Sequence, residues 1–335
     1  MKKKLRILAI MLLIAAAAAA VGAAGVWRYL DIPAGSDRIE KYVEIPAGAH
    51  FMEVAGILER EGIVKGVRRF RWLAWFKGNE TKIKAGEYAF YAAMRPSEVL
   101  DRMVRGESRT VRVTIPEGFT MRQIADLLQE KGVAEGGAFL SLVSDPEFAR
   151  SLGIQGDTLE GFLFPDTYRF TRGMGEKRIA TTLVNRFRAV FNEAYRRRLA
   201  GLSLTPEELV TLASIIEKET AAPDERYLVS AVLHNRLKAG MPLQSDPTVI
   251  YGIAGFNGNL TKDDLRKAHP HNTYLTKGLP PGPIANPGEA SLKAALYPAA
   301  VPYLYFVSRN DGTHQFSITQ AEHDRAVAAY QRRRQ

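Results

Sequence analysis

The chain has 335 residues, which is long enough for a membrane anchor followed by two or three compact units. Its apolar share of 46% and charged share of 24% are those of ordinary globular proteins, and the absence of cysteine excludes disulfide scaffolds, thiolate metal sites, cysteine nucleophiles and lipid-bearing cysteines. Much of the net charge of +10 lies at the two ends of the chain, so the charge indicates membrane topology and solubility, and no nucleic-acid partner is expected.

The first predicted element is a membrane-spanning helix. Residues 7–27 carry no charge, and twenty-one such residues are enough to cross a bilayer. Basic residues within 1–6 predict a cytoplasmic tail, which places the rest of the chain on the extracytoplasmic or periplasmic side of the cytoplasmic (inner) membrane. The alanine run also offers cleavage sites of a signal peptide, but the length of the apolar run favours a retained, single-pass anchor.

An internal repeat with a constant offset of seventy residues follows the anchor. Each copy predicts a short strand, a turn at proline and glycine, and an amphipathic helix that ends at a glycine. Seven residues are identical in the two copies: Val43, Ile45, Pro46, Gly48, Ala55, Leu58 and Gly62 match Val113, Ile115, Pro116, Gly118, Ala125, Leu128 and Gly132. Two small βα modules are therefore predicted within residues 40–150, and the spacing fits either a structural platform or a carbohydrate-binding module.

A turn rich in aromatic residues, which carries Glu160 and Asp166, follows the modules. An arginine-rich helix is predicted over residues 177–199. The next helix, over residues 205–220, starts with threonine, proline and a glutamate three positions after the threonine, which is the pattern of a capping box. A further helix is predicted over residues 224–239.

A long segment rich in glycine and proline, residues 241–288, is broken only by a short helix after Asp246 and Pro247. Loops of this length inside compact domains are usually functional. The chain then predicts a helix capped at Asn286, a hairpin around an Asn-Asp-Gly turn, and a last helix capped by Thr319.

The helix over residues 205–220 places one glutamate on its apolar side. At about 100° per residue, Glu217 falls between Ala213 and Val210 on the apolar arc. Burial and the negative end of the helix dipole both disfavour the charged form of such a carboxyl group, which suits a general acid that works near neutral pH. The residues alone fit at least as well a helix-end glutamate that is paired with an arginine or lysine.

The same helix does not supply a second carboxylate for a two-carboxylate glycosidase. Glu219 lies about 200° around the helix from Glu217, so the two side chains diverge. Asp246 in the long loop is the best candidate for a second carboxylate, although it is also a good helix N-cap before Pro247.

Other chemistries lack their sequence motifs. No G-x-S-x-G or S-x-x-K motif and no phosphate-binding glycine loop occurs. His269 and His271 form a weak metal pattern without an H-E-x-x-H motif, and loop histidines are more often exposed residues than ligands. Neither a metal nor a cofactor is therefore expected.

Several segments of the C-terminal half together resemble one family. They are Ala213-Ser-Ile-Ile-Glu-Lys-Glu-Thr220, Asn235-Arg-Leu237, Gln244-Ser-Asp-Pro-Thr-Val-Ile-Tyr-Gly252, Asn272-Thr-Tyr274, Gly278-Leu-Pro-Pro-Gly-Pro-Ile284, Asn286-Pro-Gly288 and Tyr303-Leu-Tyr-Phe-Val307. From about residue 40 almost to its end, the chain is similar to endolytic murein transglycosylases of the YceG-like family. The resemblance implies an inner-membrane anchor and a LysM-like N-terminal portion, which suit the apolar helix and the repeat.

The resemblance also implies a reaction and its catalytic residue. The family's catalytic glutamate is the first one of the Glu-Lys-Glu-Thr motif, which is Glu217 here. The implied reaction is nonhydrolytic cleavage of the β-1,4 bond between N-acetylmuramic acid and N-acetylglucosamine in nascent strands, which leaves 1,6-anhydro-muramyl ends and helps to terminate strand elongation. The candidates for binding the sugars are Gln244, Asp246, Asn272, Tyr274 and Glu219.

The predicted architecture is α+β, with a cytoplasmic tail (1–6), a transmembrane anchor (7–27), LysM-like modules (40–150) and a mixed α/β catalytic domain (155–335). The expected partners are peptidoglycan glycan strands and peptidoglycan synthases of the penicillin-binding class. Two alternatives stay open. One is a muramidase-type hydrolase that pairs Glu217 with Asp246, and the other is a noncatalytic scaffold that binds the cell wall.

Overall fold

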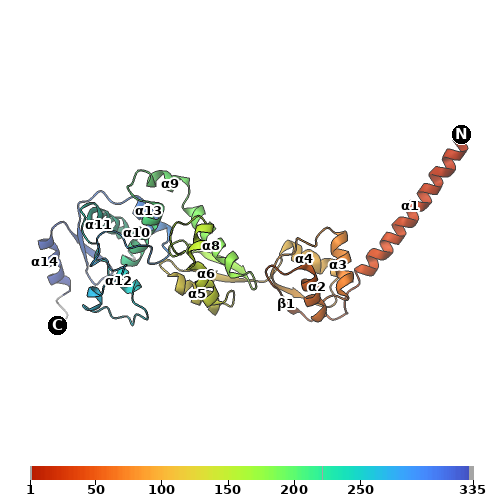
Figure 1. Cartoon of the computed structure of the whole chain (residues 1–335), viewed down its shortest axis with the longest axis horizontal. Coiled ribbons are helices and arrows are strands. Elements are labelled where there is room, and N and C mark those ends of the chain that lie inside the picture. Colours follow the sequence, from red (N-terminus) through yellow and green to blue (C-terminus); the bar gives the residue numbers. More distant parts are fainter. Residues whose placement is uncertain (1, 221, 332–335) are drawn as a thin grey trace. The chain divides into compact units, whose positions relative to one another are not determined.

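The structure of the chain is a computed structural model that describes residues 2–220 and 222–331. Helices alternate with three two-stranded sheets, which confirms the predicted α+β class (Figure 1). Met1 of the predicted cytoplasmic tail and residues 332–335 of the predicted catalytic domain lie outside the described residues.

The chain forms two compact units. The first contains residues 1–111 and 169–175, and the second contains residues 112–168 and 176–335. Residues 43–62, the first copy of the repeat, lie in the first unit, and residues 113–132, the second copy, lie in the second unit.

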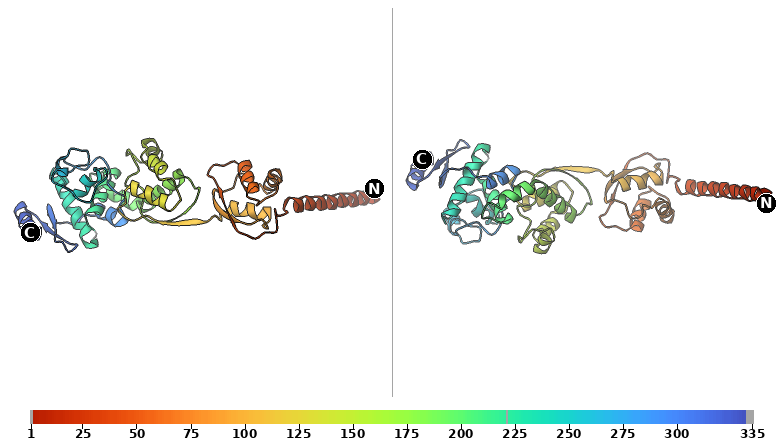
Figure 2. Two further views of the ribbon diagram at one scale, coloured as in Figure 1. Left: turned by 90° about the horizontal axis from the view of Figure 1, so that it is seen from below. Right: turned by 90° about the horizontal axis from the view of Figure 1, so that it is seen from above.

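The first unit begins with α1 (Lys2–Leu30), which both further views show as one continuous helix (Figure 2). Its segment Ile10–Leu30 is long and apolar enough to cross a membrane, with a mean hydropathy of 2.2, and its most apolar part is not buried against the rest of the chain. This segment fits the predicted single-pass anchor, and by length and composition it also fits a signal sequence.

A β-α-α-β arrangement and one more helix complete the first unit. The elements are β1 (Lys41–Ile45), α2 (Phe51–Arg60), α3 (Val67–Phe76), β2 (Gly86–Phe90) and α4 (Pro96–Arg105). The strands pair in antiparallel register, from Lys41 opposite Phe90 to Ile45 opposite Gly86. One apolar core joins the strands to the helices, and Leu30 at the end of α1 is part of it.

The second unit begins with the second copy of the repeat and continues through the helical C-terminal half. Its elements up to residue 199 are β3 (Thr110–Thr114), α5 (Met121–Glu130), α6 (Gly136–Val143), α7 (Pro146–Ser151), β4 (Thr167–Thr171), α8 (Glu176–Val190) and α9 (Glu193–Leu199). The ends of β3 and β4 belong to the first unit. The remaining elements are α10 (Pro206–Glu219), the 3-10 turn η1 (Pro223–Glu225), α11 (Arg226–Lys238), α12 (Asp246–Tyr251), the 3-10 turn η2 (Asp264–Arg266), α13 (Glu289–Leu296), β5 (Tyr305–Ser308), β6 (His314–Ser317) and α14 (Gln320–Tyr330).

The central helix of the second unit is α10, which packs against α11 and α13. It starts as predicted, with Thr205 as N-cap and Glu208 completing the capping box. Residues 209–216 are all buried, so the helix is covered on every side and not only along one apolar arc. Glu217 follows directly, at the point where the helix leaves the core.

The predicted repeat is present as local structure. Helix α5 begins and ends seventy residues after α2. The turn glycines match in their left-handed backbone angles, with φ 80° at Gly48 and 74° at Gly118. The glycines after the helices match as well, with φ 71° at Gly62 and 63° at Gly132.

Two predicted helix caps are wrong. Helix α13 starts after Gly288, and the side chain of Asn286 bonds elsewhere. Helix α12 follows Ser245 as its N-cap, so Asp246 is the first helical residue and not the cap.

Candidate active site

Glu217 lies in the last turn of α10, and its side chain is only 7% exposed. Gly288 donates its backbone N–H to Glu217 Oε2 at 3.0 Å, and Arg226 Nη2 lies 3.9 Å from Oε1. Because Gly288 is the N-cap of α13, the carboxylate also meets the positive end of that helix. The Glu217 carboxyl group is thus surrounded by a backbone donor, a guanidinium group and the positive end of α13.

A second carboxyl group, that of Glu117, belongs to the same site. Glu117 lies in the turn between β3 and α5, and a Cβ atom at Gly288 would overlap its carboxyl group, so this group packs directly against the Gly288 backbone. Burial and, to a smaller extent, the charge of Glu217 raise the pKa of Glu117, while Arg226 opposes the shift. Two carboxyl groups and one guanidinium group therefore meet at the start of α13.

Sequence reasoning missed Glu117, although the repeat contains a signal for it. In the second copy Pro116-Glu-Gly118 occupies the place of Pro46-Ala-Gly48 in the first. The glycine keeps its left-handed conformation in both copies, so the turn itself is conserved between them. A charge that appears within an otherwise unchanged turn indicates that the side chain, and not the turn, has a separate role.

Asn286 fixes this turn beside the end of α10. Its backbone N–H and its side-chain amide both donate to Phe119 O, at 2.8 and 2.9 Å, and its own carbonyl accepts from Gly118 N–H at 2.9 Å. Lys218 Nζ adds a hydrogen bond to Gly118 O at 3.3 Å. The turn, the end of α10 and the start of α13 are thus held together by short contacts.

Glu160 is buried and joins three segments of the second unit. It is 2% exposed and accepts hydrogen bonds from Met121 N–H at 2.9 Å, Asn286 Nδ2 at 2.8 Å and the Tyr251 hydroxyl at 3.2 Å. Burial raises the pKa of Glu160 to about 8, although these hydrogen bonds oppose the shift. Its link to the site runs through Asn286, so Glu160 supports the site without facing it.

Glu219 and Glu217 contact different parts of the unit, as predicted. The Ser245 hydroxyl donates to Glu219, and burial raises the pKa of Glu219 to about 7 against the effect of that hydrogen bond. Asp246, which also raises this pKa, accepts a hydrogen bond from the Tyr274 hydroxyl at 2.6 Å. The structure therefore groups Asp246 and Tyr274 with Glu219, and the carboxyl group beside Glu217 is that of Glu117.

Gln244 is exposed and has a left-handed backbone, with φ 52°, which is uncommon for a residue with a side chain. Arg236, the arginine of the Asn235-Arg-Leu237 motif in α11, stabilises this backbone conformation. Its guanidinium group donates to Gln244 Oε1 at 3.2 Å and to the carbonyl groups of Pro242 and Leu243 at 3.2 and 2.9 Å. A buried arginine thus holds an exposed amide in place.

Asn272, one of the candidates for binding sugar, is enclosed in the loop. Asn272 is 0% exposed, and its amide donates to the carbonyl groups of Leu265 and Lys267 at 3.0 and 2.8 Å. Its side-chain oxygen accepts from Tyr274 N–H at 2.9 Å. All its polar atoms are used inside the loop, so Asn272 shapes the loop and has no surface for a ligand.

Within residues 2–220 and 222–331, no group of three or more His, Cys, Asp or Glu side chains is placed to hold a metal ion. The two histidines of the weak metal pattern contact each other and the last residue of α12. His271 N–H donates to His269 Nδ1 at 3.1 Å, and the His271 ring lies 5.0 Å from the ring of Tyr251.

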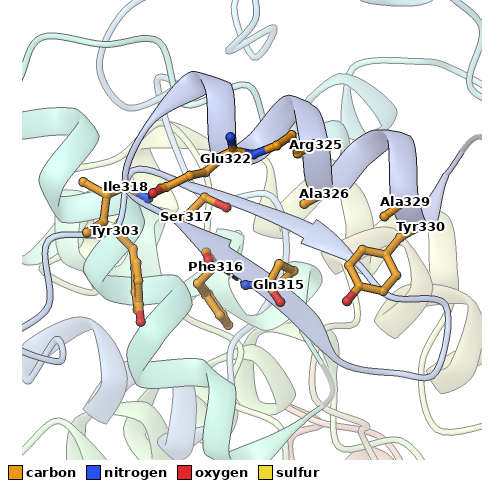
Figure 3. A pocket seen from close by; sticks show the side chains of 10 residues that line it. All are labelled: Tyr303, Gln315, Phe316, Ser317, Ile318, Glu322, Arg325, Ala326, Ala329 and Tyr330. Atoms are coloured by element: carbon orange, nitrogen blue, oxygen red, sulfur yellow. Dashed lines mark hydrogen bonds between the residues drawn. The ribbon is translucent and has the colours of Figure 1, made fainter.

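A separate groove of about 500 Å³ lies between the β5–β6 hairpin and α14 (Figure 3). Tyr303, Phe316 and Tyr330 contribute rings to its lining, and Glu322 contributes a carboxylate. That carboxylate accepts the N–H groups of Ile318 and Thr319 at 3.0 and 3.1 Å, so it is used to cap α14. The groove contains none of the carboxyl groups that meet at Gly288.

The fold and the site define an α+β protein in which a buried helix ends at a pair of carboxyl groups beside a guanidinium group. The YceG-like family matches residues 43–329, and the chain belongs to this family. The match includes both copies of the repeat and every residue of the site.

Relatives and a solved structure agree with this assignment. The chain is 30% identical to a Bacillus subtilis (strain 168) protein named endolytic murein transglycosylase, over 83% of this chain and 81% of the relative. It is 31% identical to a Streptococcus pneumoniae serotype 2 protein of the same name, over 84% of this chain and 57% of that longer relative. The crystal structure of a YceG-like protein from Listeria monocytogenes matches 86% of this chain and 99% of its own, with 32% identity and a TM-score of 0.59.

Proposed function

We propose that the chain is a membrane-anchored endolytic murein transglycosylase in which Glu217 is the catalytic acid and base. The observation that carries the proposal is the position of Glu217, which is nearly buried, bonded to Gly288 and adjacent to a second carboxyl group. The substrate is peptidoglycan, and the bond cleaved is the β-1,4 link between N-acetylmuramic acid and N-acetylglucosamine within nascent strands.

One carboxyl group is sufficient for this reaction because the substrate supplies its own nucleophile. Protonated Glu217 gives its proton to the glycosidic oxygen as the bond from that oxygen to C1 of the muramyl sugar breaks. The C6 hydroxyl oxygen of the same sugar then bonds to C1, and its proton passes to the Glu217 carboxylate. No water is consumed, the product has a 1,6-anhydro end, and Glu217 returns to its protonated form.

Glu117 and Arg226 adjust the charge of the site in these two steps. Two charged carboxylates at close range repel each other, so the pair of Glu117 and Glu217 favours a state that holds one proton, which is the proton that the first step needs. A charged Glu117 also stabilises the positive charge that develops on the sugar ring in the transition state. In the second step Arg226 and the Gly288 N–H stabilise the Glu217 carboxylate until it accepts the proton.

The sugar contacts that we propose come from exposed polar groups of the long loop and from Arg226. Gln244 and Asp246 are both exposed, and Tyr274 orients Asp246. The Arg226 side chain is 13% exposed and its Nη2 lies 3.9 Å from Glu217 Oε1, so its guanidinium group is the proposed donor to a sugar oxygen at this point. Glu219 acts on the sugar indirectly, because its carboxyl group is bonded to Ser245.

The proposed location is the outer face of the cytoplasmic membrane, with α1 retained as a single-pass anchor. Helix α1 leads into the first unit without a linker, because Leu30 is buried in the core and Asp31 is bonded to Ser97. An enzyme held there would meet glycan strands as they leave their synthases, which are the proposed protein partners, and its cuts would end strand elongation.

The two-carboxylate hydrolase remains the alternative enzyme, with Glu117 in place of Asp246 as the second carboxylate. Product analysis separates the possibilities. Purified full-length protein in detergent micelles would be incubated with uncrosslinked glycan strands in heavy-oxygen water, and the products would be weighed. We expect anhydro ends without heavy oxygen. Reducing ends that carry heavy oxygen would show a hydrolase, and uncut strands would show a scaffold, and either result would overturn the proposal.

A further inference from the structure

Helix α3 in the first unit exposes an aromatic surface. Trp72, Trp75 and Phe76 are 56%, 57% and 54% exposed, and their ring centroids lie 5.0 to 6.2 Å apart, so the three rings form one patch. The opposite side of α3 is packed in the core of the unit. Arg68 and Arg71 are exposed on the same outer side as the rings. We call these five residues the α3 surface.

The α3 surface adjoins the end of the membrane-spanning helix. The Arg69 guanidinium group lies 4.5 Å from the ring centroid of Tyr29, and Arg69 Nη2 donates to Ile32 O at 3.4 Å. At about 100° per residue, Phe76 lies only about 20° around α3 from Arg69, and Trp72 lies about 60° away. The aromatic rings thus begin next to the side of α3 that contacts the anchor.

The length of the membrane-spanning segment determines the depth at which Arg69 contacts Tyr29 and Ile32. Ile10–Leu30 has 21 residues, which at about 1.5 Å per residue is close to the roughly 30 Å hydrocarbon core of a bilayer. Tyr29 and Ile32 then lie at the headgroup level. The junction cannot bend freely, because Asp31 accepts hydrogen bonds from Ser97 N–H and Oγ at 2.7 and 2.9 Å and Leu30 is buried.

We propose that the α3 surface docks on the lipid headgroup layer of the membrane that α1 spans. Tryptophan is enriched at this depth because its ring is apolar and its N–H group is polar. Arg68 and the Nη atoms of Arg71 suit the phosphate groups of lipids, while Arg71 Nε donates to Glu80 Oε1 at 3.0 Å. The two arginines line an open groove of about 610 Å³ together with Met52, Trp72, Trp75 and Glu80. The first unit is thereby held against the bilayer at a second point beside the anchor. The proposal does not depend on the transglycosylase activity.

Tryptophan fluorescence of the full-length protein in vesicles tests the proposal. The chain has three tryptophans, so Trp27→Phe leaves only the two of the α3 surface. This variant would be reconstituted into vesicles of phosphatidylcholine and phosphatidylglycerol, with or without bromine on the upper part of the acyl chains. We expect brominated lipid to quench the emission of Trp72 and Trp75. Emission that is the same in both kinds of vesicle would overturn the proposal.

A charge-reversed variant and a matched control test the arginines. Arg68→Glu with Arg71→Glu, in the Trp27→Phe background, should lose quenching, because the added carboxylates repel anionic lipid. Arg196→Glu with Arg197→Glu reverses the same number of charges on α9, where both residues are exposed, and should leave quenching unchanged. Equal effects of the two double variants would contradict docking at the α3 surface. A change of emission caused by added glycan strands, without quenching by lipid, would identify a carbohydrate surface and overturn the proposal.

Discussion

The carboxyl groups of Glu117 and Glu217 meet at one glycine. Gly288 donates its N–H to Glu217, and the Glu117 carboxyl group occupies the space that a side chain at Gly288 would need. The two glutamates are a hundred residues apart in the chain, and the start of α13 brings them together. A side chain at this position would therefore displace the Glu117 carboxyl group, although the φ of −75° at Gly288 suits any residue.

Gly288→Ala should lower activity by roughly 10²-fold, because the new methyl group must displace the Glu117 carboxyl group, and small misplacements in an active site have effects of this size. Initial rates of anhydro-end release measure the change. The matched control is Gly282→Ala, because a Cβ atom there meets nothing within 4 Å and its φ is not left-handed. Equal rates in the two variants would show that the Glu117 carboxyl group has no role at Gly288.

Glu117→Gln should reduce the rate at least about tenfold, which corresponds to about 1.4 kcal/mol of barrier. It removes both the repulsion that keeps one proton in the pair and the negative charge near the developing cation. The alkaline limb of the pH–rate profile should also move to lower pH, because without that repulsion the single proton is lost more easily. A purely structural role would lower the rate at every pH and leave the shape of the profile unchanged.

The control for this prediction is Glu147→Gln in α7. Glu147 is exposed and lies outside the site. The control variant therefore removes the same charge as Glu117→Gln, but at a position away from Glu217 and Gly288. The proposed role of Glu117 is wrong if both variants keep the activity and the pH profile of the parent protein.

Local patterns in the sequence predicted α10 and the place of Glu217 on it, because helical periodicity and capping depend on neighbouring residues and Thr205 starts α10 where expected. They left the role of Glu217 open, and its assignment as the catalytic residue rests on the resemblance to the YceG-like family. Glu117 could not be assigned in the same way, since its contact with Gly288 depends on how distant segments pack. Asn272 shows a similar limit. It was named as a candidate for sugar binding from its motif, whereas its exposure of 0% depends on the tertiary fold and could not be predicted from neighbouring residues.

Glu160 should make the stability of the protein depend on pH. Its pKa is about 8 in the folded state against an ordinary 4.5, so the folded state holds this proton more tightly than the unfolded state. The stabilisation is complete below about pH 4.5 and is lost as the pH rises toward 8. Glu219 has a pKa of about 7 in the folded state, so it also stabilises the fold at low pH and loses this contribution as the pH rises toward 7. Thermal unfolding of the full-length protein, followed by circular dichroism at several pH values, should show a falling midpoint across this range.

Glu160→Gln tests the origin of this pH dependence. The amide oxygen can still accept from Met121 and Asn286, and the side chain no longer titrates. The fall of the unfolding midpoint between about pH 5 and 8 should therefore be smaller in this variant. An unchanged slope would show that Glu160 does not carry the effect.

Glu217→Gln should remove nearly all activity while the protein stays folded. The glutamine keeps the shape of the side chain and can accept the Gly288 N–H, but it has no proton to transfer. Loss of a positioned general acid typically costs roughly 10²–10⁴-fold in rate, and here the same group also serves as the base. The measurement is the release of anhydro-muropeptides from glycan strands, together with strand binding, which should persist.

Glu219→Gln is the matched control, because it changes the same residue type two positions further along α10. Glu219 bonds to Ser245 and lies apart from the Gly288 contact, and a glutamine oxygen can still accept from the Ser245 hydroxyl. We therefore expect a milder loss than in Glu217→Gln. Near-normal activity of Glu217→Gln, or an equal loss in both variants at equal thermal stability, would contradict a mechanism in which Glu217 alone transfers the proton. An equal loss would instead place the chemistry on the whole end of α10, with Glu219 as a second acidic group.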